Sequence, residues 1–364
     1  MNDWQKNKIR ITYIMPSAAA GGAERFLLDL ISNLDLEKFV PSLILFDHGG
    51  FFLKDFAALG MPVVVLQKKY KFDLGNFCKL RQALKKLKPD IVHTQLGGDV
   101  YGRLVARCLG VKKIISTEQN VQVHEDWLAN KLKTWTAKFA NKIVAISEAV
   151  KADSLKRYQL PPEKLIVIPN GVDVQKFFVK PRALTSPGKI ILGSVGRLTE
   201  QKNFSFLIKA LASFKDKNFE CLIAGEGELR KDLQTQINSL ELGQKIKLVG
   251  LQKDIPVFLQ QLDVFILPSL WEGLGIVALE AGLTGLPVLA ARVDGLKEII
   301  KDEATGWLFD PQDEKDLAAK LSYVFDFNNR EILKDRGRKL QVAVLERFDI
   351  KNIVRQYEKL YFNL

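Results

Sequence analysis

The chain alternates short runs rich in Val and Ile with longer amphipathic stretches, and this alternation restricts the folds open to it. Such a pattern is typical of parallel strands joined by crossover helices. Runs that are apolar on both faces, as at residues 63–66 and 264–267, indicate sheets covered by helices on both sides. The expected strands are residues 9–15, 41–46, 62–66, 90–94, 113–117, 142–146, 164–168, 189–195, 219–224, 245–249, 264–267 and 287–290.

The series of strands restarts after about residue 183. Residues 179–188 contain two prolines and a glycine without periodicity, which is typical of a linker. A chain of 364 residues also exceeds what one hydrophobic core usually fills. We therefore expect two doubly wound domains that face each other across a cleft, with ligands bound beyond the carboxyl ends of the strands.

Glycines follow the first strand of each expected domain. Gly21 and Gly22 stand where a loop enters a helix, whose free N–H groups can hold an anion, although a tight turn explains them equally well. In the second domain Gly196 is followed by Arg197 and Lys202, two cations suited to clamp a diphosphate. The next strand leads to Gly225 and Glu226, which suit a close approach to a ligand or a simple turn.

The segment from residue 267 to residue 281 is the most informative. A strand ends near Leu267, a loop with Gly273 and Gly275 follows, and a helix is expected to begin near Leu274 or Gly275. Glu272 then lies in the loop and Glu280 on the second turn of the helix. Each carboxylate can accept two hydrogen bonds from vicinal hydroxyls. The spacing predicts a sugar at one end, a ribose at the other and a diphosphate between them, at the helix amino terminus.

Several classes of site lack support in the composition. No Asp-x-Asp pair occurs, and the three cysteines and three histidines have no metal-ligand spacing, so no metal is expected. The longest uncharged stretch, residues 11–23, is shorter than a membrane-spanning helix, and the amino terminus does not resemble a signal peptide. A cytoplasmic protein is expected.

Taken together, short segments along the chain resemble the retaining enzymes of glycosyltransferase family 4, which have the GT-B fold of two facing Rossmann-like domains. The similarity covers nearly the whole chain and ends with residues 348–361, which resemble the terminal helix that crosses back to the first domain. The expected domains are therefore residues 1–183 with about 347–364, for the acceptor, and residues 184–346, for the donor. The segments are residues 21–24, 101–103, 168–173, 196–198, 202–203, 225–227 and 268–280.

The resemblance implies roles for these residues. Arg197 and Lys202 would bind the donor diphosphate, Glu280 the ribose and Glu272 the hydroxyls of the transferred sugar. Backbone N–H groups near Gly22, Leu274 and Gly275 would complete the phosphate cradle, and the nucleobase would lie near residues 249–252, which include Gly250 and Leu251. The family needs no divalent metal or other cofactor.

The implied activity moves a hexosyl or N-acetylhexosaminyl group from a nucleotide diphosphate sugar to a hydroxyl of a glycan or lipid-linked acceptor. The setting would be the synthesis of cell-envelope polysaccharide or glycolipid, with no nucleic acid as partner. A nucleotide-sugar epimerase of the same fold and a non-catalytic sugar-nucleotide-binding subunit are the alternatives. A Rossmann oxidoreductase is not favoured, because neither glycine loop has the dinucleotide fingerprint.

One position departs from the family pattern. Many relatives carry a histidine near the transferred sugar, and this chain has Gln119 there, which forms hydrogen bonds but carries no proton at neutral pH. His93, at the end of an expected strand, is interpreted as a core or supporting residue. His124 lies in a loop that allows no assignment.

The net charge of +12 lies entirely in residues 1–183, which indicates an anionic partner or a solvated basic surface. Lysines alternate with an apolar stripe, a composition typical of a helix on an anionic membrane. Packing of this stripe on the sheet is the alternative. We therefore expect contact between the basic domain and the inner face of the plasma membrane as a hypothesis. The stripe is Trp127, Leu128, Leu132, Trp135 and Phe139 beside Lys131, Lys133, Lys138 and Lys142, and a second basic cluster is Lys68, Lys69, Lys71, Lys79, Arg81, Lys85, Lys86 and Lys88.

Overall fold

The computed structural model describes residues 8–47, 49–67, 74–121, 127–177 and 188–364. The chain divides into two compact units, and we call Met1–Gly171 with Ile350–Leu364 unit 1 and Val172–Asp349 unit 2. The expected domain boundary at residues 183 and 184 lies outside the described residues and stays a prediction. His124 also lies outside the described residues, as do Lys68, Lys69 and Lys71 of the second basic cluster, whose assignment stays a prediction.

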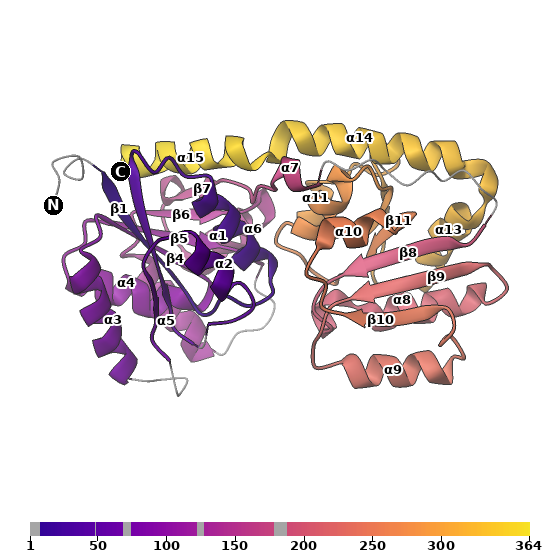
Figure 1. The fold of residues 1–364 in the computed structure, drawn as a ribbon, viewed down its shortest axis with the longest axis horizontal. Coiled ribbons are helices and arrows are strands. Elements are labelled where there is room, and N and C mark those ends of the chain that lie inside the picture. Colours follow the sequence, from indigo (N-terminus) through magenta and orange to yellow (C-terminus); the bar gives the residue numbers. More distant parts are fainter. Residues whose placement is uncertain (1–7, 48, 68–73, 122–126, 178–187) are drawn as a thin grey trace. The chain divides into compact units, whose positions relative to one another are not determined.

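Unit 1 contains a seven-stranded parallel sheet (Figure 1). Its strands are β1 (Ile9–Met15), β2 (Phe39–Leu45), β3 (Val63–Val65), β4 (Ile91–Gln95), β5 (Lys113–Glu118), β6 (Lys142–Ala145) and β7 (Leu165–Val167). Its helices are α1 (Gly22–Ser32), α2 (Leu53–Ala58), α3 (Leu74–Leu87), α4 (Asp99–Cys108), α5 (Trp127–Ala137), α6 (Glu148–Tyr158) and α15 (Ile350–Asn363). The strand order β3-β2-β1-β4-β5-β6-β7 reverses between β1 and β4, as in doubly wound folds.

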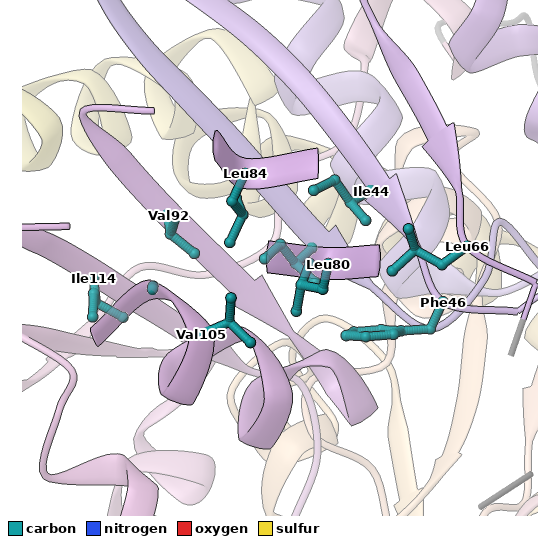
Figure 2. Close-up of a cluster of buried hydrophobic side chains, with 10 residues drawn as sticks. Ile44, Phe46, Leu66, Leu80, Leu84, Val92, Val105 and Ile114 are labelled. Atoms are coloured by element: carbon teal, nitrogen blue, oxygen red, sulfur yellow. The ribbon is translucent and has the colours of Figure 1, made fainter. Parts of the chain in front are cut away.

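The two faces of the unit 1 sheet are buried against different helices. On one face Ile44 and Val92 pack with Leu80 and Leu84 of α3 and with Val105 of α4 (Figure 2). The other face is covered by α15, which Figure 1 shows on the opposite side of the sheet from α3 and α4. Both faces are therefore apolar, as the continuous hydrophobic runs predict.

The return of the closing segment to the first domain is confirmed. Tyr361 of α15 packs against the sheet, with its hydroxyl 3.1 Å from the hydroxyl of Tyr13 and 2.8 Å from Nδ1 of His93. Nε2 of His93 lies 2.7 Å from the hydroxyl of Thr117. Burial lowers the pKa of His93 to about 3, so the ring stays neutral. His93 is a core residue that fastens the helix to the sheet.

Unit 2 contains a six-stranded parallel sheet in the order β10-β9-β8-β11-β12-β13, which reverses between β8 and β11. Its strands are β8 (Ile190–Val195), β9 (Phe219–Ala224), β10 (Ile246–Gly250), β11 (Val264–Leu267), β12 (Val288–Ala291) and β13 (Trp307–Phe309). Its helices are α7 (Val174–Phe177), α8 (Phe204–Leu211), α9 (Arg230–Ser239), α10 (Ile255–Gln260), α11 (Ile276–Leu283), α12 (Asp294–Lys297), α13 (Glu314–Phe325) and α14 (Arg330–Phe348).

The sequence analysis did not predict β13, because Trp307–Phe309 contains no Val or Ile, whereas the equally short β3 and β7 do. Other boundaries follow local signals. α13 begins where the Asp313 carboxylate accepts hydrogen bonds from the N–H groups of Lys315 and Asp316. α10 begins in the same way after Asp254, with a proline in its first turn. In the part of the chain that the structure describes, no helix is long and apolar enough to cross a membrane.

Candidate active site

Two loops meet at the point where the strand order of unit 2 reverses. β8 and β11 are neighbours there, and the loops that follow them run through residues 196–203 and 268–275. Doubly wound sheets bind ligands at this point, beyond the carboxyl ends of the strands. Seven of the predicted site residues lie in these two loops: Gly196, Arg197, Lys202, Glu272, Gly273, Leu274 and Gly275.

The backbones of the two loops are joined by hydrogen bonds. The N–H of Leu270 donates to the carbonyl of Gln201 at 2.8 Å, and the Gln201 side-chain amide donates to the carbonyl of Trp271 at 2.9 Å. Gln201 therefore holds the second loop against the first. The sequence analysis did not single it out, since a glutamine between Glu200 and Lys202 has no distinctive spacing.

Lys202 and Glu272 form an ion pair across these loops. The Lys202 ammonium lies 2.5 Å from Oε1 of Glu272, and the Ser269 hydroxyl donates to the same oxygen at 2.7 Å. The side chains are 15% and 8% exposed, so the pair is largely shielded from water. Two residues assigned to different parts of a donor, the diphosphate and the sugar, are thus in contact with each other. Together they present a cation and an acceptor side by side.

Arg197 differs from Lys202 in its surroundings. It directly follows Gly196 after the end of β8 and is exposed. Its guanidinium makes no ion pair or hydrogen bond with any of the residues that the structure describes. An exposed cation beside the buried Lys202 pair is available to an anionic ligand.

Two glycines after strands of unit 2 have backbone conformations that favour glycine. Gly225 follows β9 with φ +141°, and a Cβ there would lie 1.9 Å from the carbonyl oxygen of Gly196. Gly275 has φ +86° and directly precedes α11. Both conformations are ones that residues with a side chain rarely adopt. Glycine at these places therefore serves close packing of the loops.

We expect Gly225→Ala to move the loop after β8 and to weaken binding of a nucleotide by about tenfold or more, because the clash is with backbone rather than with a flexible side chain. Isothermal titration with nucleoside diphosphates measures this. Gly243→Ala is a suitable control, since a Cβ at Gly243 would meet only a side-chain atom 3.9 Å away. Equal affinity of the two variants would contradict this interpretation.

Glu280 lies on the second turn of α11, as predicted, and its side chain is 6% exposed. α11 is packed closely on α14, where a Cβ at Gly282 would lie 3.0 Å from the side chain of Leu340. This packing holds the helix in place. The free N–H groups at its amino terminus follow Gly275 directly.

The loops after β9 and β10 also touch. The N–H of Gly225 donates to the carbonyl of Gly250 at 2.8 Å, and Leu251 beyond it is 50% exposed. The carboxylate of Glu226 pairs with Arg230 at 2.9 Å. An exposed leucine at the carboxyl end of β10 offers an apolar surface to a flat ring.

Three predicted residues lie in unit 1. α1 begins at Gly22 with Gly21 as its N-cap, so the loop-to-helix transition is where the sequence predicts it. Gln119 follows β5, donates to Oε1 of Gln95 at 3.0 Å and accepts from the amide of Asn170 at 2.8 Å. Gln95 and Asn170 were not predicted as neighbours of Gln119, because Gln95 ends β4 and Asn170 follows β7, both of which are distant from Gln119 in the sequence.

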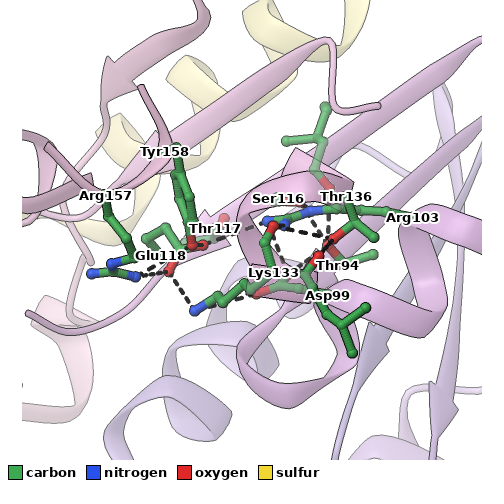
Figure 3. Close-up of polar contacts among 12 residues, drawn as sticks. Thr94, Asp99, Arg103, Ser116, Thr117, Glu118, Lys133, Thr136, Arg157 and Tyr158 are labelled. Carbon is green, nitrogen blue, oxygen red and sulfur yellow. Dashed lines mark hydrogen bonds and ion pairs between the residues drawn. The ribbon is translucent and has the colours of Figure 1, made fainter. Parts of the chain in front are cut away.

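A buried cluster of charges lies next to Gln119 (Figure 3). Arg103 is 0% exposed and lies 3.5 Å from Glu118 and 3.7 Å from Asp99. Lys133 of α5 lies 2.9 Å from Glu118, whose other oxygen accepts the hydroxyl of Tyr158 at 2.6 Å. Burial raises the pKa of Glu118, but Lys133 and Arg103 outweigh burial and lower it to about 2.

This cluster corrects one expectation. The sequence analysis grouped Lys133 with the cations beside the apolar stripe, as part of a helix suited to an anionic membrane. The structure turns Lys133 inward, because its ammonium pairs with Glu118 at the end of β5. Among the described residues no three His, Cys, Asp or Glu side chains gather to hold a metal ion.

Two doubly wound parallel units, with a C-terminal helix that returns to the first, define a two-domain α/β protein of the GT-B fold. HepE of Anabaena in complex with UDP and glucose shares this fold, with a TM-score of 0.86, 22% identity and coverage of 98% of this chain and 100% of that one. TarM is similar with a TM-score of 0.80 at 14% identity, over 99% of this chain and 100% of that one.

The families described as "Glycosyltransferase Family 4" and "Glycosyl transferases group 1" match residues 20–176 and 176–340. The chain therefore belongs to the group 1 glycosyltransferases of family 4, as the resemblance implied, and it is a glycosyltransferase.

Curated relatives have related activities. The UDP-Gal:alpha-D-GlcNAc-diphosphoundecaprenol alpha-1,3-galactosyltransferase of Escherichia coli is 28% identical over 385 residues, which cover 98% of each chain. The amylovoran biosynthesis glycosyltransferase AmsK of Erwinia amylovora is 38% identical over 172 residues, 44% of this chain and 42% of that one.

Proposed function

We propose that this glycosyltransferase moves a hexosyl or N-acetylhexosaminyl group from a UDP-sugar to a hydroxyl of a lipid-linked glycan, with retention of the anomeric configuration. The observation that carries the proposal is the Lys202–Glu272 pair at the switch point of unit 2. Lys202 supplies a cation for a diphosphate, and the adjacent Glu272 carboxylate supplies a hydrogen-bond acceptor for sugar hydroxyls. The names of the relatives support the choice of UDP and of a lipid-linked acceptor.

In this proposal the residues of unit 2 stabilise the departing UDP. Lys202 and the exposed Arg197 neutralise charge that grows on the diphosphate, and the amino terminus of α11 adds N–H donors. Glu272 holds the sugar and Glu280 the ribose. Gly250 and Leu251 lie against the base. The leaving phosphate accepts the proton of the attacking hydroxyl, so no protein base is required and Gln119 is compatible with turnover.

We further propose that the reaction needs no divalent metal, since two cations and a helix terminus stand where a metal would balance the leaving group. Transfer that continues unchanged in EDTA, with the anomeric configuration of the product read by NMR, tests metal independence and retention together. Inversion, or loss of turnover that Mg²⁺ restores, would refute the corresponding part.

The acceptor is assigned to unit 1, at the inner face of the plasma membrane. The net positive charge of residues 1–183 suits the diphosphate of a lipid carrier, such as the diphosphoundecaprenol named for the Escherichia coli relative. An epimerase would instead release a free sugar nucleotide without an acceptor, and a binding subunit would turn nothing over. Product analysis with and without acceptor separates these alternatives.

Glu280→Gln is expected to weaken binding of UDP by about 10- to 100-fold, because a charged hydrogen bond to a ribose hydroxyl contributes roughly 1.5–3 kcal/mol. Isothermal titration measures the affinity. Glu314→Gln, an exposed change in the same unit, is the matched control and should bind UDP like the unmodified protein. Unchanged affinity for UDP in Glu280→Gln would show that Glu280 does not bind the ribose.

A further inference from the structure

The outward side of α5 carries unusually exposed aromatic residues. Trp127 is 69% exposed, Trp135 50% and Leu128 47%. Helices that cross over a parallel sheet normally bury such side chains. The alternative that the whole stripe packs on the sheet is therefore excluded for these three residues.

These residues share one face of the helix with two cations. Lys131 and Lys138 are exposed, and the Lys131 ammonium lies 3.9 Å from the centre of the Trp127 ring. At 100° per residue, positions 127, 128, 131 and 135 fall within about a third of the helix circumference, and Lys138, in the turn directly after α5, continues the same period. A shallow hollow of about 440 Å³ runs along this face, between Trp127 and Lys138. We call these five residues the α5 face.

The opposite side of the same helix is fixed inside unit 1. Lys133 pairs with Glu118, its carbonyl accepts from Arg103 at 3.2 Å, and Thr136 is fully buried. These buried contacts fix the orientation of the helix, so the α5 face points outward.

The charge of this region favours an anionic partner. No acidic residue occurs between Trp127 and Lys142, while four lysines do. Trp and Leu beside Lys on one helix face is the composition of helices that lie in a membrane interface, where the apolar side chains enter the acyl boundary and the cations meet headgroups.

Topology places this face at the acceptor end of unit 1. β5 and β6 are parallel, so α5 starts at the carboxyl-end edge of the sheet and returns the chain to the opposite edge. Trp127 is its first residue and therefore lies toward the edge where doubly wound sheets bind ligands. A bilayer on the α5 face would bring a lipid-linked acceptor to that edge.

We propose that the α5 face docks the enzyme on an anionic phospholipid bilayer. The α5 face is the surface that contacts the lipid. This proposal rests on the proposed function only in taking the acceptor to be lipid-linked.

Flotation of the full chain with vesicles, without donor or acceptor, tests the proposal. The unmodified protein should float with phosphatidylcholine–phosphatidylglycerol vesicles and much less with phosphatidylcholine alone. Lys131→Gln with Lys138→Gln should bind about 30-fold more weakly, since each cation near an anionic surface contributes roughly fivefold. Trp127→Ser with Trp135→Ser should lose at least tenfold.

Val342→Ser with Lys339→Gln changes an exposed apolar residue and an exposed cation on α14 and is the matched control, expected to float normally. All variants should transfer sugar to a water-soluble acceptor analogue at the unmodified rate, which also shows that they fold. If the unmodified protein did not float with the anionic vesicles, the proposal would be overturned. This is the result expected if the α5 face binds a protein or a second copy of the chain instead of lipid. Normal flotation of the Trp variant would overturn the proposal as well. Loss of transfer by the unmodified protein to every acceptor would instead refute the proposed function.

Discussion

Lys202→Ala is expected to lower kcat/KM for the sugar donor by about 10²- to 10³-fold. A preorganised charge aimed at a group that becomes more negative in the transition state has effects of this size when it is removed. The side chain is only 15% exposed, so water does not readily replace it. Steady-state rates over a range of donor concentrations measure the effect, and a fall in kcat would show that Lys202 acts on the leaving group rather than on binding alone.

Lys209→Ala is the matched control, because Lys209 is an exposed lysine of unit 2 that pairs with Glu314. It should leave kcat/KM unchanged. Since Lys202 contacts Glu272, the effects of Lys202→Ala and Glu272→Ala should not add in the double variant. Rates within threefold of the unmodified enzyme for Lys202→Ala would contradict its role at the diphosphate.

Arg103→Met is expected to destabilise unit 1 by about 3–5 kcal/mol. Removing one partner of a buried ion pair leaves the other charge uncompensated in a medium that solvates it poorly. Arg103 lies between Asp99 and Glu118, both nearly inaccessible to water, and its Nε donates to the Ser116 hydroxyl at 2.7 Å. Urea unfolding of the full chain, followed by circular dichroism, measures the change.

Arg107→Met provides the control on the same helix, one turn later and exposed to solvent. It should shift the free energy of unfolding by less than about 0.5 kcal/mol, as surface substitutions usually do. If the two methionine variants unfolded at the same urea concentration, the buried cluster would not contribute to stability.

The alternation of short apolar runs and amphipathic stretches was sufficient to predict both sheets, because strands buried on both faces leave continuous Val and Ile runs in the sequence. Twelve of the strands were predicted and are present, whereas β13 was missed because it contains no Val or Ile. The switch-point loops could be predicted too, since glycines and charged residues directly after strands mark them.

The sequence could not predict which side chains contact each other. Nothing in the spacing of Lys202 and Glu272 shows that they meet, because they are 70 positions apart and converge only when β8 and β11 become neighbours. Lys133 was grouped with the other lysines beside the apolar stripe for a related reason. The helical period shows which residues share a side of α5, but it does not show which side faces the sheet. The structure shows this, because Lys133 pairs with Glu118 at the end of β5.

The position of α15 affects how the protein is made. Unit 1 contains residues from both ends of the described chain, and Tyr357 and Tyr361 fill its core against Tyr13 and His93. On the ribosome, all of unit 2 emerges before these tyrosines do. Unit 2 is therefore the first part able to complete its packing during translation, while the earlier-made sheet holds an open apolar face that calls for chaperone protection until the last helix emerges.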